Sequence, residues 1–72
     1  MDKTEHKILD VAMRVFASEG YEGATTRKIA EAAEVDEVTL FRKFQSKENI
    51  LRAVIIINRG VILNTLDSVL RM

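Results

Sequence analysis

Apolar residues recur along this chain every three or four positions, which is the spacing of one buried face of an α-helix. We expect a first helix from about Thr4 to Ser18, ended by Glu19-Gly20 because glycine is the usual residue at a left-handed helix stop. Tyr21 is expected to pack back onto the core, and Glu22-Gly23-Ala24 to form the connecting loop. The apolar stripe of this helix consists of Ile8, Leu9, Ala12, Met13 and Phe16, with Val15 beside it.

Residues 25–44 predict two further helices, over about residues 26–33 and 36–43, joined by a tight turn at residues 33–35. Thr25 or Thr26 is placed to cap the first, and Asp36 to cap the second by accepting from the N–H groups of Val38 and Thr39. The residues expected to be buried are Ile29, Ala30, Ala33, Leu40 and Phe44. Those expected to face outward are Glu37, Val38, Thr39, Arg42 and Lys43. This is the helix-turn-helix pattern, whose exposed second helix suits a DNA groove.

A fourth helix is predicted from Lys47 to about Leu70, with Ser46 as its cap. Residues 53–57 are apolar on every face of this helix, and apolar residues continue to Leu70. A helix that is apolar all round must be buried all round. The other three helices can cover only one side of it, so we expect the rest to meet another part of the protein or another subunit.

The predicted fold is therefore all-α: a three-helix, homeodomain-like helix-turn-helix bundle over residues 1–46, with the motif at about 25–44. The long fourth helix occupies residues 47–72. Cysteine and proline are absent from the 72 residues, which excludes a disulfide framework and a thiolate metal site. No apolar run approaches a membrane span, and the mixed charge of the first seven residues is unlike a signal peptide. We expect a cytoplasmic protein with no cofactor and no metal.

The distribution of charge is more informative than its sum, because 11 basic and 11 acidic residues cancel. The basic residues of the middle segment are Arg27, Lys28, Arg42, Lys43 and Lys47. Arg27, Lys28 and Lys47 fall in the first turns of predicted helices, where a cation is unfavourable in isolation. A bound phosphate reverses that sign, because free N–H groups and a cation then converge on one anion. The hydroxyls of Thr25, Thr26 and Thr39 add donors for phosphate oxygens.

The ordered spacing of these residues resembles the N-terminal domain of the TetR family of transcriptional repressors. The residues that carry the resemblance are Ile8-Leu9, Ala12, Phe16, Gly20-Tyr21, Thr25-Thr26, Ile29-Ala30, Ala33, Val35, Thr39-Leu40-Phe41, Phe44, Lys47 and Leu51. The resemblance implies a three-helix DNA-binding domain whose third helix reads the major groove of a palindromic operator. It also implies a homodimer, and a small-molecule inducer bound by a C-terminal domain that this chain does not contain.

Three positions depart from the family pattern. Glu34 stands where glycine is usual, Phe41 where a tyrosine hydroxyl would contact a phosphate, and Val38 where a small residue or proline is frequent. A valine there can instead contact a thymine methyl group. A non-glycine residue in a left-handed turn costs on the order of 1–2 kcal/mol.

The candidate DNA-binding residues are Thr25, Thr26, Arg27, Lys28, Glu37, Val38, Thr39, Phe41, Arg42, Lys43 and Lys47. The threonines and Lys47 are expected to hold the DNA backbone, whereas Arg27, Arg42 and Lys43 can reach either a base edge or a phosphate. Glu37 has two interpretations: it accepts from a cytosine amino group, or it is a favourable first-turn acid of its helix.

The alternative function is a helical protein–protein or dimerisation module that uses the helix-turn-helix as a scaffold. An enzyme is disfavoured, because the sequence shows no nucleophile–base pair, metal-ligand set or phosphate-binding glycine loop.

Overall fold

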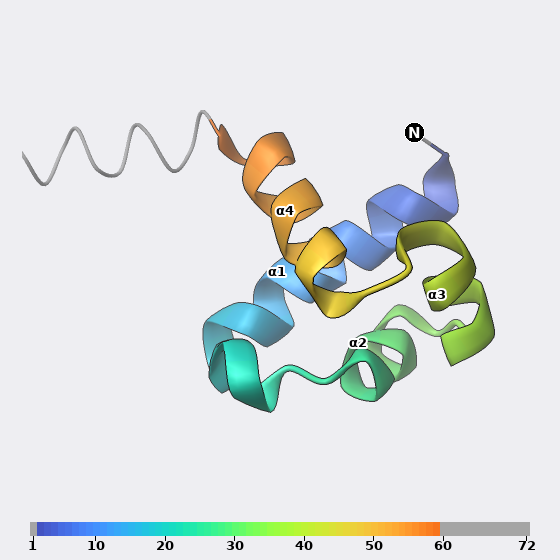
Figure 1. The fold of residues 1–72 in the computed structure, drawn as a ribbon, viewed down its shortest axis with the longest axis horizontal. Helices are drawn as coiled ribbons and strands as arrows, with labels where there is room; N and C mark the ends of the chain where they lie inside the picture. Colours follow the sequence, from blue (N-terminus) through green and yellow to red (C-terminus); the bar gives the residue numbers. More distant parts are fainter. Residues whose placement is uncertain (1, 60–72) are drawn as a thin grey trace, which may run out of the picture.

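The computed structural model describes residues 2–59, and within them the chain forms four helices and no strand. They are α1 (Lys3–Gly23), α2 (Thr26–Ala33), α3 (Glu37–Phe44) and α4 (Lys47–Ile57). The long helix α1 packs against α2 and α4, and α3 contacts both α2 and α4 (Figure 1). The all-α prediction is confirmed. The part of the predicted fourth helix between residue 60 and Leu70 lies outside the described residues.

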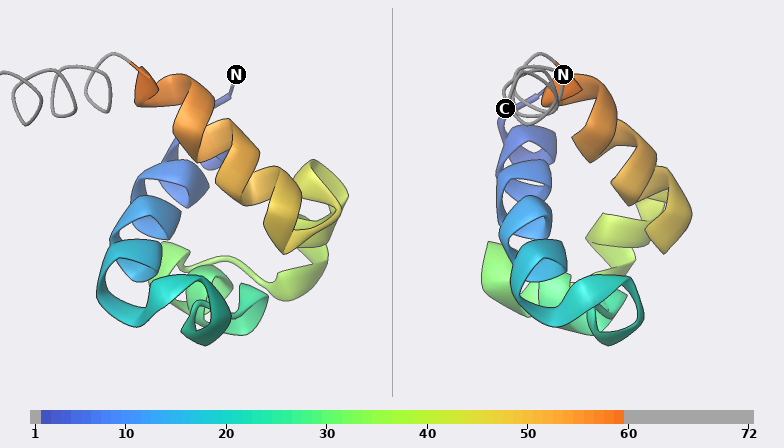
Figure 2. Two further views of the ribbon diagram at one scale, coloured as in Figure 1. Left: turned by 60° about the vertical axis from the view of Figure 1, so that its left-hand side comes forward. Right: turned by 90° about the vertical axis from the view of Figure 1, so that its left-hand side faces the viewer.

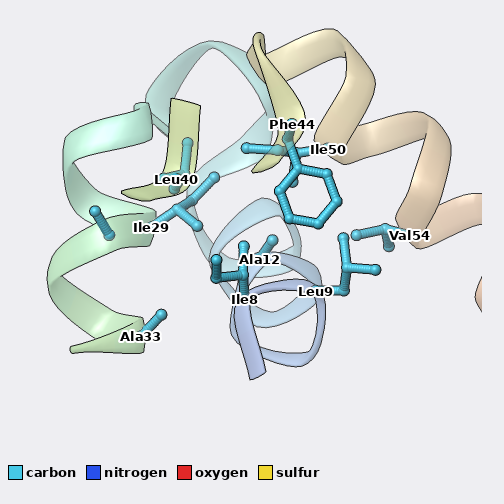
Figure 3. Close-up of a cluster of buried hydrophobic side chains, with 10 residues drawn as sticks. Ile8, Leu9, Ala12, Ile29, Ala33, Leu40, Phe44, Ile50 and Val54 are labelled. Carbon is cyan, nitrogen blue, oxygen red and sulfur yellow. The ribbon is translucent and has the colours of Figure 1, made fainter. Parts of the chain in front are cut away.

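One hydrophobic core joins the four helices (Figure 3). Its buried members are Ile8, Leu9, Ala12, Ile29, Ala30, Ala33, Leu40, Phe44, Ile50 and Val54. All five residues predicted to be buried in α2 and α3 are among them. Met13 belongs to the predicted stripe of α1 but is exposed, and it lines a hollow of ≈ 140 Å³ together with Ile57.

The end of α1 differs from the prediction. Gly20 has φ 74° and ψ 170°, which interrupts the helix, but the chain then resumes a helical turn that ends at Gly23. The predicted break of the first helix at Gly20 is thus confirmed, whereas the predicted loop at residues 22–24 is wrong for residues 22 and 23, which are helical. A Cβ atom on Gly20 would meet no atom within 4 Å, so glycine is needed there for its backbone angles rather than for space.

Each helix begins at a short polar side chain that accepts from a free backbone N–H group. The four capping pairs are Asp2 with Glu5 N (2.8 Å), Thr25 with Lys28 N (3.1 Å), Asp36 with Thr39 N (2.7 Å) and Ser46 with Asn49 N (3.1 Å). Thr25, not Thr26, is thus the cap of α2. The Asp36 and Ser46 caps are confirmed.

Two residues other than glycine adopt positive φ at the turns around α3. Glu34 is left-handed (φ 60°, ψ 40°), and Glu34 N and Val35 N donate to Glu31 O and Ala30 O at 3.1 and 3.0 Å. This pair of bonds is the Schellman motif that ends many helices. Gln45 (φ 68°, ψ −33°) lies at the centre of a γ-turn of the rarer kind, closed by Ser46 N donating to Phe44 O at 2.8 Å.

Candidate nucleic-acid interface

The face of α3 opposite the core is open to solvent. Successive residues of an α-helix are rotated by about 100°, so the buried pair Leu40 and Phe44 fixes which residues point away from the core. Arg42 lies almost opposite that pair, with Val38 and Thr39 on either side of it. Val38 is 64% exposed although it is apolar. Phe41 and Lys43 lie at the two borders of this face, and Phe41 is also exposed.

The start of α2 carries cations whose intramolecular partners are weak. Arg27 Nε lies 3.3 Å from Glu31 Oε1, and Lys28 Nζ lies 3.4 Å from Glu19 Oε2. The Arg27 side chain is 78% exposed, and the Lys28 side chain 50%. Exposed ion pairs of this kind contribute about 0–1 kcal/mol, so another anion can replace the carboxylates at little energetic cost.

The starts of α2 and α3 are joined by one side-chain hydrogen bond. Thr26 Oγ1 donates to Glu37 Oε2 at 3.3 Å, and the Glu37 side chain is exposed. Glu37 therefore links the two helices of the motif, a role that neither sequence interpretation included. The bond engages one carboxylate oxygen, so Glu37 still has acceptor capacity for a donor outside the protein.

The start of α4 is closed by contacts with the end of α1. Lys47 Nζ donates to Tyr21 O at 2.7 Å and lies 4.1 Å from the centre of the Tyr21 ring. That ring stacks on Phe16 at 5.9 Å, which confirms that Tyr21 packs back onto the fold. Burial, and then the Glu48 carboxylate, raise the pKa of the Tyr21 phenol. The cation at this helix start is thus partly satisfied by the protein itself.

Lys43 is also held by the protein. Its Nζ lies 2.7 Å from Asp2 Oδ2 and 4.0 Å from Glu5 Oε1, at the other end of α1. The hydrogen bond to Lys43, and then the cap bond from Glu5 N, lower the pKa of Asp2 to about 2, while Asp2 raises the pKa of Lys43. Sequence reasoning overlooked both acids. Asp2 and Glu5 are three positions apart, as in a capping box, and this spacing was the available signal.

The structure therefore sorts the candidate residues into one continuous region and two separate positions. The region formed by the start of α2 and the outer face of α3 contains Thr25, Thr26, Arg27, Lys28, Glu37, Val38, Thr39, Phe41 and Arg42. Lys47 lies instead at the Tyr21 contact and Lys43 at the first turn of α1. Two further views show that α3 lies between α2 and the start of α4 (Figure 2).

Two capped helices joined by a left-handed turn, the second with an exposed outer face, define this fold as a helix-turn-helix domain. Residues 8–54 match the family model described as bacterial regulatory proteins, tetR family. The chain belongs to this family.

Three relatives support the assignment. The chain is 40% identical to an uncharacterized HTH-type transcriptional regulator, YvkB, of Bacillus subtilis over 71 residues, which cover 94% of this chain and 38% of that protein. It is 42% identical over 48 residues to the regulator TcmR of Streptomyces glaucescens (67% of this chain, 21% of that protein). It is 41% identical over 51 residues to the repressor AcnR of Corynebacterium glutamicum (71% and 27%). No solved structure matches the chain.

The chain thus spans about two fifths of YvkB and a smaller share of the other two relatives. The family model describes bacterial regulatory proteins, and the three relatives are named as transcriptional regulators or repressors. Among residues 2–59, none of the helices combines the length and the apolar character that crossing a membrane requires.

Proposed function

We propose that this chain is the operator-reading part of a ligand-responsive repressor that binds a palindromic site as a dimer. The observation that supports this most directly is the contrast between the two sides of α3. Leu40 and Phe44 bury one side, while Val38, Thr39 and Arg42 on the other have no internal function in packing the core. An exposed helix of this kind enters the major groove in other helix-turn-helix proteins.

The threonines and lysines of the interface hold the DNA backbone in this proposal. Thr25 Oγ1 accepts from Lys28 N, which leaves its own O–H free to donate to a phosphate oxygen. Thr26, Lys28 and Thr39 add donors at the same two helix starts. Lys47 donates one N–H to Tyr21 O, and an ammonium group has two more. Phe41 lacks a hydroxyl, so it contributes only apolar contact.

Sequence is read by the exposed residues that can reach base edges. Arg27 is suited to the acceptors of guanine and Val38 to the methyl group of thymine, whereas Arg42 is assigned to a phosphate oxygen. Glu37 accepts from a cytosine amino group through the carboxylate oxygen that Thr26 does not engage. A phosphate near Glu37 would be repelled, so a contact between Glu37 and DNA would be with a base rather than with the backbone.

Dimerisation and the response to an inducer depend on the larger part of the protein. Ile55, Ile56 and Ile57 are exposed on α4, and Ile56 is 71% exposed. Three adjacent exposed isoleucines support burial against another part of the protein or a second subunit. A dimer would place two copies of α3 one DNA turn apart, about 34–36 Å, and inducer binding would change that separation. The same isoleucines support the alternative, a protein–protein module.

The test is selection of bound duplexes from a random DNA pool with the full-length protein. Enrichment of an inverted repeat supports the proposal, and absence of any enriched sequence contradicts it. Salt dependence separates the two functions. For DNA binding, log K should fall by about 0.9 for each phosphate neutralised per tenfold rise in salt. Binding through the isoleucines should be nearly independent of salt.

A further inference from the structure

The cation at the last turn of α3 is in a different electrostatic environment from its neighbour in the sequence. Lys43 Nζ has the carboxylates of Asp2 and Glu5 at 2.7 and 4.0 Å, and its side chain is only 26% exposed. Arg42 is exposed and, within residues 2–59, has no ion-pair partner. Two carboxylates offset the charge of this one ammonium, so Lys43 attracts a phosphate less strongly than the exposed Arg42 does.

The same contact connects distant parts of the chain. Asp2 and Lys43 are separated by 41 positions, and their bond joins the first turn of α1 to the last turn of α3. Asp2 is itself fixed, because its other oxygen, Oδ1, caps α1 by accepting from Glu5 N at 2.8 Å. One carboxylate of Asp2 therefore both caps α1 and binds Lys43. In Figure 1 the start of α1 lies beside the upper end of α3.

The chain after Lys43 needs such support. Gln45 adopts a strained γ-turn immediately after α3. Strained backbone persists only where several contacts determine it together. Asn49 Nδ2 donates to Phe44 O at 2.8 Å from one side of the turn, and Gln45 Nε2 donates to Arg42 O at 3.2 Å. Lys43 supplies the contact on the side of α1.

From these observations we infer that Asp2 and Glu5 clamp Lys43, and that Lys43 is a positioning residue of the DNA interface rather than a ligand of DNA phosphate. The clamp sets the angle at which α3 leaves the core, and its two acids mark the edge of the DNA footprint. This inference rests on the proposed function, and it assigns Lys43 a role different from that of Arg42.

The experiment measures the affinity of the full-length protein for a duplex of about two helical turns (roughly 20 bp), at several salt concentrations. The variants are Lys43→Gln, Asp2→Asn and their combination, with Arg42→Gln as the matched neighbour. Asparagine at position 2 keeps the helix cap and removes only the charge. Lys43→Gln and Asp2→Asn should each weaken binding by roughly two- to fivefold, with the salt slope unchanged, and the double variant should be no weaker than either. Arg42→Gln should reduce the slope by about 0.9.

Two results would overturn the clamp: a salt slope reduced by about 0.9 in Lys43→Gln, or tighter DNA binding by Asp2→Asn. The first would make Lys43 a phosphate ligand, and the second would make the acids simple competitors of DNA. If the wild-type protein binds no DNA at all, the proposed function fails, and the clamp is judged separately by NMR titration of Asp2. Its carboxyl pKa of about 2 should rise in Lys43→Gln, and an unchanged pKa would show that the clamp does not exist.

Discussion

The first turns of α2 and α4 share one sequence feature but differ in structure. Both place a lysine or arginine at an electropositive helix start. At α2, the ion pairs of Arg27 and Lys28 within residues 2–59 are with the exposed carboxylates of Glu31 and Glu19, which an incoming anion can replace. At α4, Lys47 is bound to the Tyr21 carbonyl and lies over its ring. The start of α2 is therefore open to an anion as it stands, whereas a phosphate at the start of α4 would share Lys47 with the Tyr21 carbonyl.

The largest effect on binding should come from Arg27→Ala. We expect a loss of about 1–3 kcal/mol of operator affinity and relaxed specificity at one base pair, with no change in thermal stability, because the Arg27 ion pair is exposed. Binding to a panel of single-base operator variants checks this. Arg52→Ala, at an exposed position of α4, is the control that should leave affinity unchanged. A uniform loss across the panel would remove Arg27 from base reading.

Lys47→Met should lower both stability and DNA binding, whereas Arg27→Ala should lower DNA binding alone. We expect about 1–2 kcal/mol less stability from the lost carbonyl bond and ring contact. The salt slope should fall by about 0.9, whereas Lys47→Arg should keep it. Urea unfolding and binding at several salt concentrations measure the two effects. A stability loss without a change of slope would mean that Lys47 only braces α4 against α1.

Glu34→Gly should stabilise the domain by about 1 kcal/mol, because glycine adopts the left-handed conformation of residue 34 without steric cost. For a domain of this size the melting temperature should rise by about 4–8 °C per kcal/mol. Ala32→Gly, which introduces a glycine inside α2 instead of at its end, should be destabilising by about 1 kcal/mol. DNA affinity should not change with Glu34→Gly, so a large change would connect this turn to the interface.

The smallest expected effect concerns acid stability. Asp2 has a folded-state pKa of about 2 against an ordinary value of 3.8. Its contribution is therefore present above about pH 4 and is lost as the pH falls through about 2. Wild type should be more stable than Asp2→Asn at pH 5, and the two should converge near pH 2. Urea midpoints at both pH values test this, and a difference that persists at pH 2 would mean that the charge of Asp2 is not its cause.

Most of the fold could be predicted from the spacing of apolar residues and from the caps. The bounds of α2 were predicted correctly, because Thr25 is a capping residue and the apolar face of the helix ends at Ala33. The continuation of α1 past Gly20 could not be predicted in the same way. Glycine permits many backbone angles, and the extra turn is accompanied by contacts of Tyr21 with Phe16 and Lys47 that the local sequence does not specify.

The interface was predictable in composition but not in its internal contacts. The exposed face of α3 follows from helical periodicity. The contacts of Lys43 with Asp2 and of Lys47 with Tyr21 join positions 41 and 26 residues apart. No local pattern specifies such pairs, because they depend on how the helices pack. The γ-turn at Gln45 was missed for a different reason: glutamine carries no signal for positive φ.

The left-handed backbone at Glu34 has a stereochemical consequence. Its angles, φ 60° and ψ 40°, are close to the mirror image of an ordinary right-handed helical residue. A D-glutamate would occupy this position without the steric conflict of the natural enantiomer and would keep the same carboxylate. Inverting a single stereocentre by chemical synthesis would thus separate the chirality of the turn from the chemistry of its side chain.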